Sequence, residues 1–240
     1  MREDKRDLIS AMIVPAAFVV LLWIIKILEV TTNISLTQYG LEPRSTTGLI
    51  GIITMPLLHS DFSHLSSNTL AVFLLLSGLY LFYKNFASTL FVSFYFFSSL
   101  AAWIIGTSGT IHIGASGLVY CLAWFHILSG FLKRNKPQMA FGFLVIFLYG
   151  SVVWGIFPMF QSSPRISWQG HLGGAITGIV FAILFKHKGI VHKEVIPLEE
   201  EEELSDEDPY WMEGSNEETQ KEENPQETNS NQQEINSNQS

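Results

Sequence analysis

The segment IHIGASGLVY, residues 111–120, holds Ser116 in the run Gly-Ala-Ser-Gly at the start of an apolar stretch. A serine hydroxyl is a weak nucleophile until a neighbouring base takes its proton. In a membrane helix, the commoner role of a serine is that of a small packing residue. Chemistry at Ser116 therefore requires a base that another part of the chain brings close.

His171, in the segment SWQGHLGG, is the candidate base. An uncharged imidazole accepts a proton near neutral pH, which is what a serine nucleophile needs. No acidic residue in the sequence is placed to orient His171, so the pattern predicts a Ser–His dyad without a third member. Tyr120 lies four residues after Ser116 on the same predicted helix face, and we expect its ring to pack on the imidazole.

Donors for the charge that develops on an attacked carbonyl are sought in the segment HSDFSHLSSN, which contains His59, His64 and Asn68. His64 and Asn68 are four residues apart and share one helix face if the helix has already begun at His64. The backbone N–H of Ser116 is a further candidate donor. The remaining histidines are interpreted as interfacial or packing residues: His112, His126, His187 and His192.

Six apolar segments have about the length that a helix needs to cross a bilayer. We expect helices because an open strand edge in lipid would leave backbone groups unpaired. The second, fourth and sixth segments carry Gly, Ser, Asn and His, and should face other helices rather than lipid. The six segments are residues 8–28, 66–83, 86–106, 113–131, 138–158 and 168–185.

Basic residues set the predicted orientation of these spans. With six spans they separate into a larger set on one side and a smaller set on the other. Both termini are therefore expected in the cytoplasm, and Ser116, His171, His64 and Asn68 fall in the outer third of the membrane. The larger set is Arg2, Lys5, Arg6, Lys84, Lys133, Arg134, Lys136, Lys186, Lys188 and Lys193, and the smaller set is Lys26, Arg44 and Arg165.

The segments outside the spans differ sharply in composition. The long connection between the first two spans is apolar near its end (GLIGIITMPLL) and should fold against the outer face of the membrane. Residues 199–240 hold 15 of the 22 acidic residues and one of the 14 basic ones, a composition typical of disorder. We expect a cytoplasmic N-terminus at 1–7, a helical domain at 8–190 and an acidic tail at 191–240. The single cysteine, Cys121, excludes a disulfide within the chain and a cysteine-based metal site.

At these residues the sequence resembles the rhomboid family of intramembrane serine proteases. GASG, with Ser116, matches the family's G-x-S-G, and HLGGAITG matches its His followed by helix-packing glycines, here Gly174 and Gly178. HSDFSHLSSN resembles the second-helix pattern, and Tyr120 stands where the family places an aromatic ring on the catalytic His. GLEPR and GLIGIITMPLLH resemble the first loop of bacterial and archaeal members. The likeness spans roughly residues 8–188.

The resemblance implies an all-α polytopic membrane protein, a bundle of six transmembrane helices with a membrane-associated first loop. It implies cleavage of peptide bonds in or near transmembrane segments of other proteins, with Ser116 as nucleophile and His171 as general base. It also implies an oxyanion hole of His64, Asn68 and the Ser116 amide, with His59 and Gly114 in support and no metal or cofactor. The expected partners are transmembrane substrates and the lipid bilayer, not nucleic acid, in a prokaryotic plasma membrane. Substrate, oligomeric state and the residues of a gate in the fifth helix stay open.

Two other functions fit parts of the sequence. An inactive relative would bind membrane clients without cutting them, but such proteins typically lose the Ser or the His that this chain keeps. A small channel or transporter would use the polar cluster as a water-filled path. Transporters often carry internal repeats or helices broken at the midplane. The sequence has no convincing repeat, and its polar cluster lies near one surface only.

Overall fold

The structure is a computed structural model that describes residues 2–150, 154–160 and 167–188. Within these ranges the regular structure is helical, and the only β-type pairing is an isolated bridge between Leu41 and His112. The predicted acidic tail, which includes Lys193, lies outside the described residues, and so does Arg165. The α-helices are α1 (Arg2–Thr32), α2 (Gly51–Thr54), α3 (Phe62–Phe82), α4 (Ala87–Ile105), α5 (Ser116–Lys133), α6 (Lys136–Leu148) and α8 (Trp168–Leu184).

Four of the described helices are long and apolar enough to cross a membrane. They are Lys5–Thr32 within α1, and α3, α4 and α5. Helices α6 and α8 are apolar but shorter, with 13 and 17 residues. The all-helical polytopic bundle expected from the sequence is thus observed, with a helix at each of the six predicted positions.

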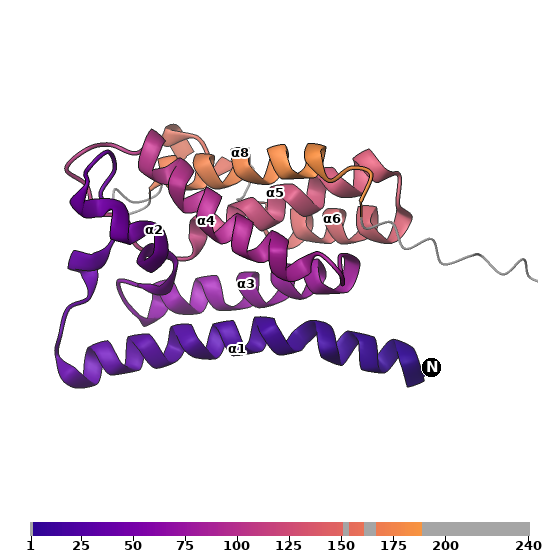
Figure 1. Ribbon diagram of the computed structural model, residues 1–240, viewed down its shortest axis with the longest axis horizontal. Coiled ribbons are helices and arrows are strands. Elements are labelled where there is room, and N and C mark those ends of the chain that lie inside the picture. Colours follow the sequence, from indigo (N-terminus) through magenta and orange to yellow (C-terminus); the bar gives the residue numbers. More distant parts are fainter. Residues whose placement is uncertain (1, 151–153, 161–166, 189–240) are drawn as a thin grey trace, which may run out of the picture. The chain divides into compact units, whose positions relative to one another are not determined.

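Helix α5 is the centre of the bundle (Figure 1). It packs against α3, α4, α6 and α8, and α1 contacts the bundle chiefly through α3. More of α5 is buried than of the other long apolar helices, which expose many large apolar side chains to the outside. This pattern suits a protein whose outer helices face lipid and whose polar side chains face inward.

Glycines let α5 and α8 approach each other closely. A Cβ atom on Gly174 would lie 2.1 Å from the Gly117 carbonyl oxygen, and one on Gly178 would lie 2.2 Å from that of Cys121. Neither distance leaves room for a carbon atom. The backbones of α5 and α8 can therefore approach this closely only because Gly174 and Gly178 have no side chain. The close contact between α5 and α8 that a pairing of Ser116 with His171 requires is therefore present.

The first loop is folded. It contains three short 3₁₀ helices, η1 (Thr37–Tyr39), η2 (Thr47–Ile50) and η3 (Met55–Leu57), besides α2. Leu41 exchanges two backbone hydrogen bonds with His112, at 2.8 and 2.9 Å. The Arg44 guanidinium donates to the Gly106 carbonyl at 3.1 Å. These bonds attach the loop to the segment that precedes Ser116.

Helix boundaries differ from the expected spans, and three of the differences bear on the site. Helix α3 begins at Phe62, four residues early, because the Asp61 carboxylate accepts from the His64 N–H at 2.8 Å and caps the helix. Helix α5 begins at Ser116, so this serine is its first residue and does not lie one turn inside it. Helix α6 ends at Leu148, ten residues short of the predicted limit, just before Gly150. Glycine disfavours helix by about 0.5–1 kcal/mol relative to alanine.

Basic residues near the predicted cytoplasmic side meet at one end of the bundle. Lys84 forms an ion pair with Asp7 at the start of α1. Lys133, in the last turn of α5, donates to the Tyr83 hydroxyl at 2.7 Å and to the Lys188 carbonyl. These contacts bring the beginning of α1 and the ends of α3, α5 and α8 together.

Candidate active site

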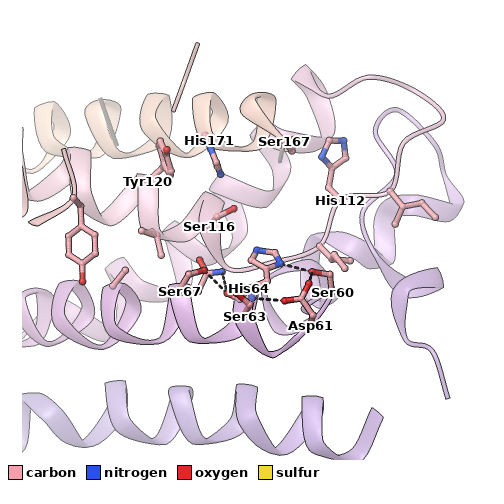
Figure 2. Close-up of a pocket in the computed structure, with 16 residues that line it drawn as sticks. Ser60, Asp61, Ser63, His64, Ser67, His112, Ser116, Tyr120, Ser167 and His171 are labelled. Atoms are coloured by element: carbon pink, nitrogen blue, oxygen red, sulfur yellow. Dashed lines mark hydrogen bonds between the residues drawn. The ribbon is translucent and has the colours of Figure 1, made fainter. Parts of the chain in front are cut away.

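A cavity of about 780 Å³ opens between α3, α5 and α8 (Figure 2). Of the seven predicted site residues, Ser116, His171, Tyr120, His64 and Asn68 line it, and His59 and Gly114 contact its wall. The structure thus gathers the whole predicted set in one place. The other lining residues are Ser60, Asp61, Ser63, Ser67, Ala71, Ile111, His112, Ile113, Val119, Tyr149 and Ser167.

The imidazole of His171 is held on two sides. Its ring lies flat on Tyr120, with the ring centres 4.0 Å apart and the planes 7° from parallel. Its Nδ1 is 3.1 Å from the Gly155 carbonyl oxygen. A carbonyl only accepts hydrogen bonds, so Nδ1 carries a proton, and in the neutral ring Nε2 has a free lone pair. A backbone carbonyl therefore fixes the tautomer of His171, whereas the sequence had indicated only the Tyr120 ring as a support for this imidazole.

Ser116 lies opposite this ring. Figure 2 shows its hydroxyl and the His171 imidazole pointing toward each other across the cavity. Its helix has no side-chain cap, because Ala115 stands at the N-cap position, whereas Asp61 and Ser167 cap α3 and α8. Amide N–H groups in an uncapped first turn attract negative charge. The nucleophile candidate therefore sits beside backbone donors suited to an oxyanion.

Asn68 and His64 differ as possible oxyanion donors. Asn68 donates one amide N–H to the His64 carbonyl at 2.9 Å, and its second N–H remains available to an oxyanion. The Ser60 hydroxyl is 2.8 Å from an Asp61 carboxylate oxygen and 3.3 Å from His64 Nδ1. When Ser60 donates to that carboxylate, it accepts from Nδ1–H, and a neutral His64 then has no proton on Nε2. His64 thus serves as a donor only when Nε2 is protonated.

His59 and Gly114 support the wall from behind. The His59 ring meets the His64 ring edge-on at 5.1 Å, and its Nε2 accepts from the Ala115 N–H at 3.4 Å. Burial, followed by the charges of His64 and Lys26, lowers the pKa of His59 to about 4, so the ring is neutral at pH 7. A Cβ atom on Gly114 would lie 2.6 Å from His64 Cε1. Gly114 therefore makes room for His64, while Gly117 makes room for α8.

Three features of the site did not emerge from the sequence. His112, interpreted as interfacial, lines the cavity and bonds Thr110 through Nε2 at 2.8 Å. Asp61, to which the sequence assigned no role, caps α3, and this bond to the His64 N–H is the main reason why its pKa is lowered. Its position three residues before His64 is the usual N-cap spacing and could have predicted the role. Lys26 is buried in α1, and its ammonium donates to the carbonyl of His59. A charged residue inside an apolar run was the signal in the sequence that could have predicted a role for it.

Known proteins resemble this chain over most of its described part. The profile of the Rhomboid domain matches residues 46–188. The chain belongs to the rhomboid family. An uncharacterized protein of Mycobacterium tuberculosis is 34% identical over 177 residues, which cover 70% of this chain and 72% of that protein. An uncharacterized protein of Mycobacterium leprae is 34% identical over 174 residues, covering 70% and 68%.

Membership in the rhomboid family agrees with the helical bundle and makes the chain an integral membrane protein. Rhomboids are a family of intramembrane proteases, and the matched region contains every predicted site residue. The mycobacterial relatives point to a prokaryotic origin.

Proposed function

We propose that this rhomboid is an intramembrane serine endopeptidase that cleaves transmembrane or juxtamembrane segments of other membrane proteins. Supporting this is the arrangement of Ser116 and His171, which face one cavity while His171 Nδ1 contacts the Gly155 carbonyl. That contact leaves Nε2 as the proton acceptor on the side of the serine. A client-binding protein without activity would not require this tautomer.

The reaction begins when Ser116 Oγ attacks the scissile carbonyl and His171 Nε2 takes the hydroxyl proton. The imidazolium that forms donates to Gly155 through Nδ1 and is further stabilised by the Tyr120 ring face. The tetrahedral oxyanion accepts from the Ser116 amide and from the second N–H of Asn68. His171 then returns the proton to the leaving amine, and water hydrolyses the acyl-enzyme by the same route in reverse.

The decisive experiment measures cleavage of a type-I-like transmembrane substrate by the purified protein in detergent. Ser116→Ala and His171→Ala should each lower the rate by about 10⁴-fold or more, because neither half of the dyad works alone. The melting temperature of Ser116→Ala should stay close to that of the parent, since Ser116 lies at a cavity. Labelling by a serine-reactive fluorophosphonate should disappear with Ser116→Ala.

Ser67→Ala is the matched control. It removes one hydroxyl from the same cavity, but the Ser67 hydroxyl donates to the His64 carbonyl at 2.8 Å and lies away from His171. Its cleavage rate should stay within about threefold of the parent rate, the loss of one exposed hydrogen bond being small. Unchanged cleavage or persistent labelling in Ser116→Ala would refute the assignment of the nucleophile.

A further inference from the structure

Lys26 is a charged residue buried within the apolar helix α1. Its side chain is 8% exposed, and that of its ion-pair partner Glu29 is 12% exposed. Ionisable groups inside a membrane span are costly and tend to be kept for a function. Neither the dyad nor the oxyanion donors use this pair.

The Lys26 ammonium has three acceptors, which equals its number of N–H donors. It donates to the Glu29 carboxylate at 2.8 Å and to the His59 and Ser60 carbonyls at 2.9 Å each. Glu29 uses its other oxygen to accept from the Leu36 N–H at 2.9 Å. The pair therefore joins α1, the start of the first loop and the residues just before α3.

The two carbonyls belong to residues whose side chains contact His64 and the turn before Ser116. His59 accepts from the N–H of Ala115, the residue before Ser116. Ser60 lies 3.3 Å from His64 Nδ1 and also contacts the Asp61 carboxylate that caps α3. A shift of residues 59–60 would therefore move the serine turn and the His64 ring together.

We propose that Lys26 is a positioning residue for the reaction of this rhomboid. Its ammonium fixes the backbone of residues 59–60, and these residues set the geometry of the turn before Ser116 and of His64. The inference rests on the proposed peptidase function. A purely structural ion pair would affect melting but would not affect turnover below the melting temperature.

The test compares Glu29→Gln with the double variant Lys26→Met/Glu29→Gln. Glu29→Gln keeps the ammonium and both of its bonds to the carbonyls, and the amide oxygen of the introduced glutamine can still accept from the ammonium. The double variant removes the ammonium and its bonds to the carbonyls without leaving the Glu29 carboxylate buried and without a cation, which would itself endanger folding. Leu79→Ala, a cavity variant in the wholly buried core of α3, lowers stability without touching residues 59–60.

All variants are assayed at a temperature well below their melting points. We expect kcat to fall about 10- to 100-fold in the double variant with KM within about threefold, since misplacement of reacting groups by 1 Å can cost 100-fold. The rate of fluorophosphonate labelling should fall in parallel. Glu29→Gln and Leu79→Ala should keep kcat within about threefold of the parent value. A double variant with the kcat of Glu29→Gln would overturn the proposal.

Amide hydrogen exchange tests the same link without any activity. In the double variant, exchange should quicken both in peptides that cover residues 57–65 and in those that cover 113–118, with no change in α6. Unchanged exchange at 113–118 would overturn the proposal even if activity fell. If the double variant exchanges as expected but the parent protein shows no Ser116-dependent cleavage, the proposed function is refuted and the structural link from Lys26 to the site stands.

Discussion

Gly114 has a backbone conformation and a position that suit no other residue type. Its φ of +118° lies where side chains are rarely tolerated, and the space for a Cβ atom is filled by the His64 ring. Its N–H also donates to the Met55 carbonyl at 2.9 Å. One residue thus connects the first loop, the His64 wall and the turn that presents Ser116.

Gly114→Ala should lower kcat by about tenfold or more, because the new methyl group displaces His64 and the turn before Ser116. Gly109→Ala is the control, since Gly109 has a φ of +76° but no atom within 4 Å of the space for its Cβ. Gly109→Ala should lose about 1 kcal/mol of stability through backbone strain. Gly114→Ala should lose more, because its methyl group also overpacks the space beside His64. Substrate cleavage and thermal melting measure the two effects, and equal activities of the two variants would contradict the contact with His64 as the cause.

The contact between α5 and α8 sets the distance between the two halves of the proposed dyad. Ser116 begins α5, His171 lies in the first turn of α8, and Gly174 meets the Gly117 carbonyl directly below them. Small residues at such interfaces let membrane helices approach closely. The distance between α5 and α8 at this point is therefore set by direct contact between their backbones, with no side chain between them.

Gly174→Ala should separate α5 from α8, because its Cβ would lie 2.1 Å from a backbone oxygen that cannot rotate away. We expect a loss of about 1–3 kcal/mol in stability from overpacking and about 100-fold in kcat from misplacing His171. In Gly170→Ala the nearest atom is the Ser167 hydroxyl oxygen at 3.3 Å, a side-chain atom that needs to move only slightly and can still cap α8. The melting temperature and kcat of this control should stay near the parent values. A Gly174→Ala variant with the parent's kcat would contradict the prediction that the distance between α5 and α8 limits the reaction.

The basic residues of the described helical bundle lie at both of its ends. Lys84 and Lys133 bind partners at one end, and Lys26 and Arg44 bind backbone carbonyls at the other. The bias of basic residues toward one side of a membrane protein sets its orientation. The end that carries Lys84 and Lys133 is therefore predicted to face the cytoplasm, and the cavity to open toward the outer side. The division into a helical domain at 8–190 and a tail at 191–240 also stays a prediction.

Reporter fusions in bacteria test this orientation. Alkaline phosphatase, which is active only outside the cytoplasm, should be active when fused after residue 108 and inactive when fused after residue 134 or 188. A fluorescent protein that folds only in the cytoplasm should give the opposite pattern at the same sites. The reverse result at all three sites would invert the predicted topology and place the cavity at the cytoplasmic surface.

Local patterns determined much of this protein. Apolar runs predicted a helix at six positions because desolvation of an unpaired backbone in lipid allows little else. The spacing of Ser116, Tyr120, His64 and Asn68 predicted which side chains share helix faces, because helical periodicity is a local property. The chemistry of an imidazole and its predicted depth in the membrane singled out His171 as the base, and the structure brings all of these residues to one cavity.

Tertiary structure alone decided which groups hold these residues in place. The Gly155 carbonyl orients His171, Lys26 holds the carbonyls of His59 and Ser60, and Gly114 yields space to His64. Each is a contact between distant parts of the chain, made by a backbone group or a buried charge that has no periodic signature. Such contacts depend on how helices pack, and packing is settled by close approaches such as that of Gly174 to Gly117, which no single segment encodes.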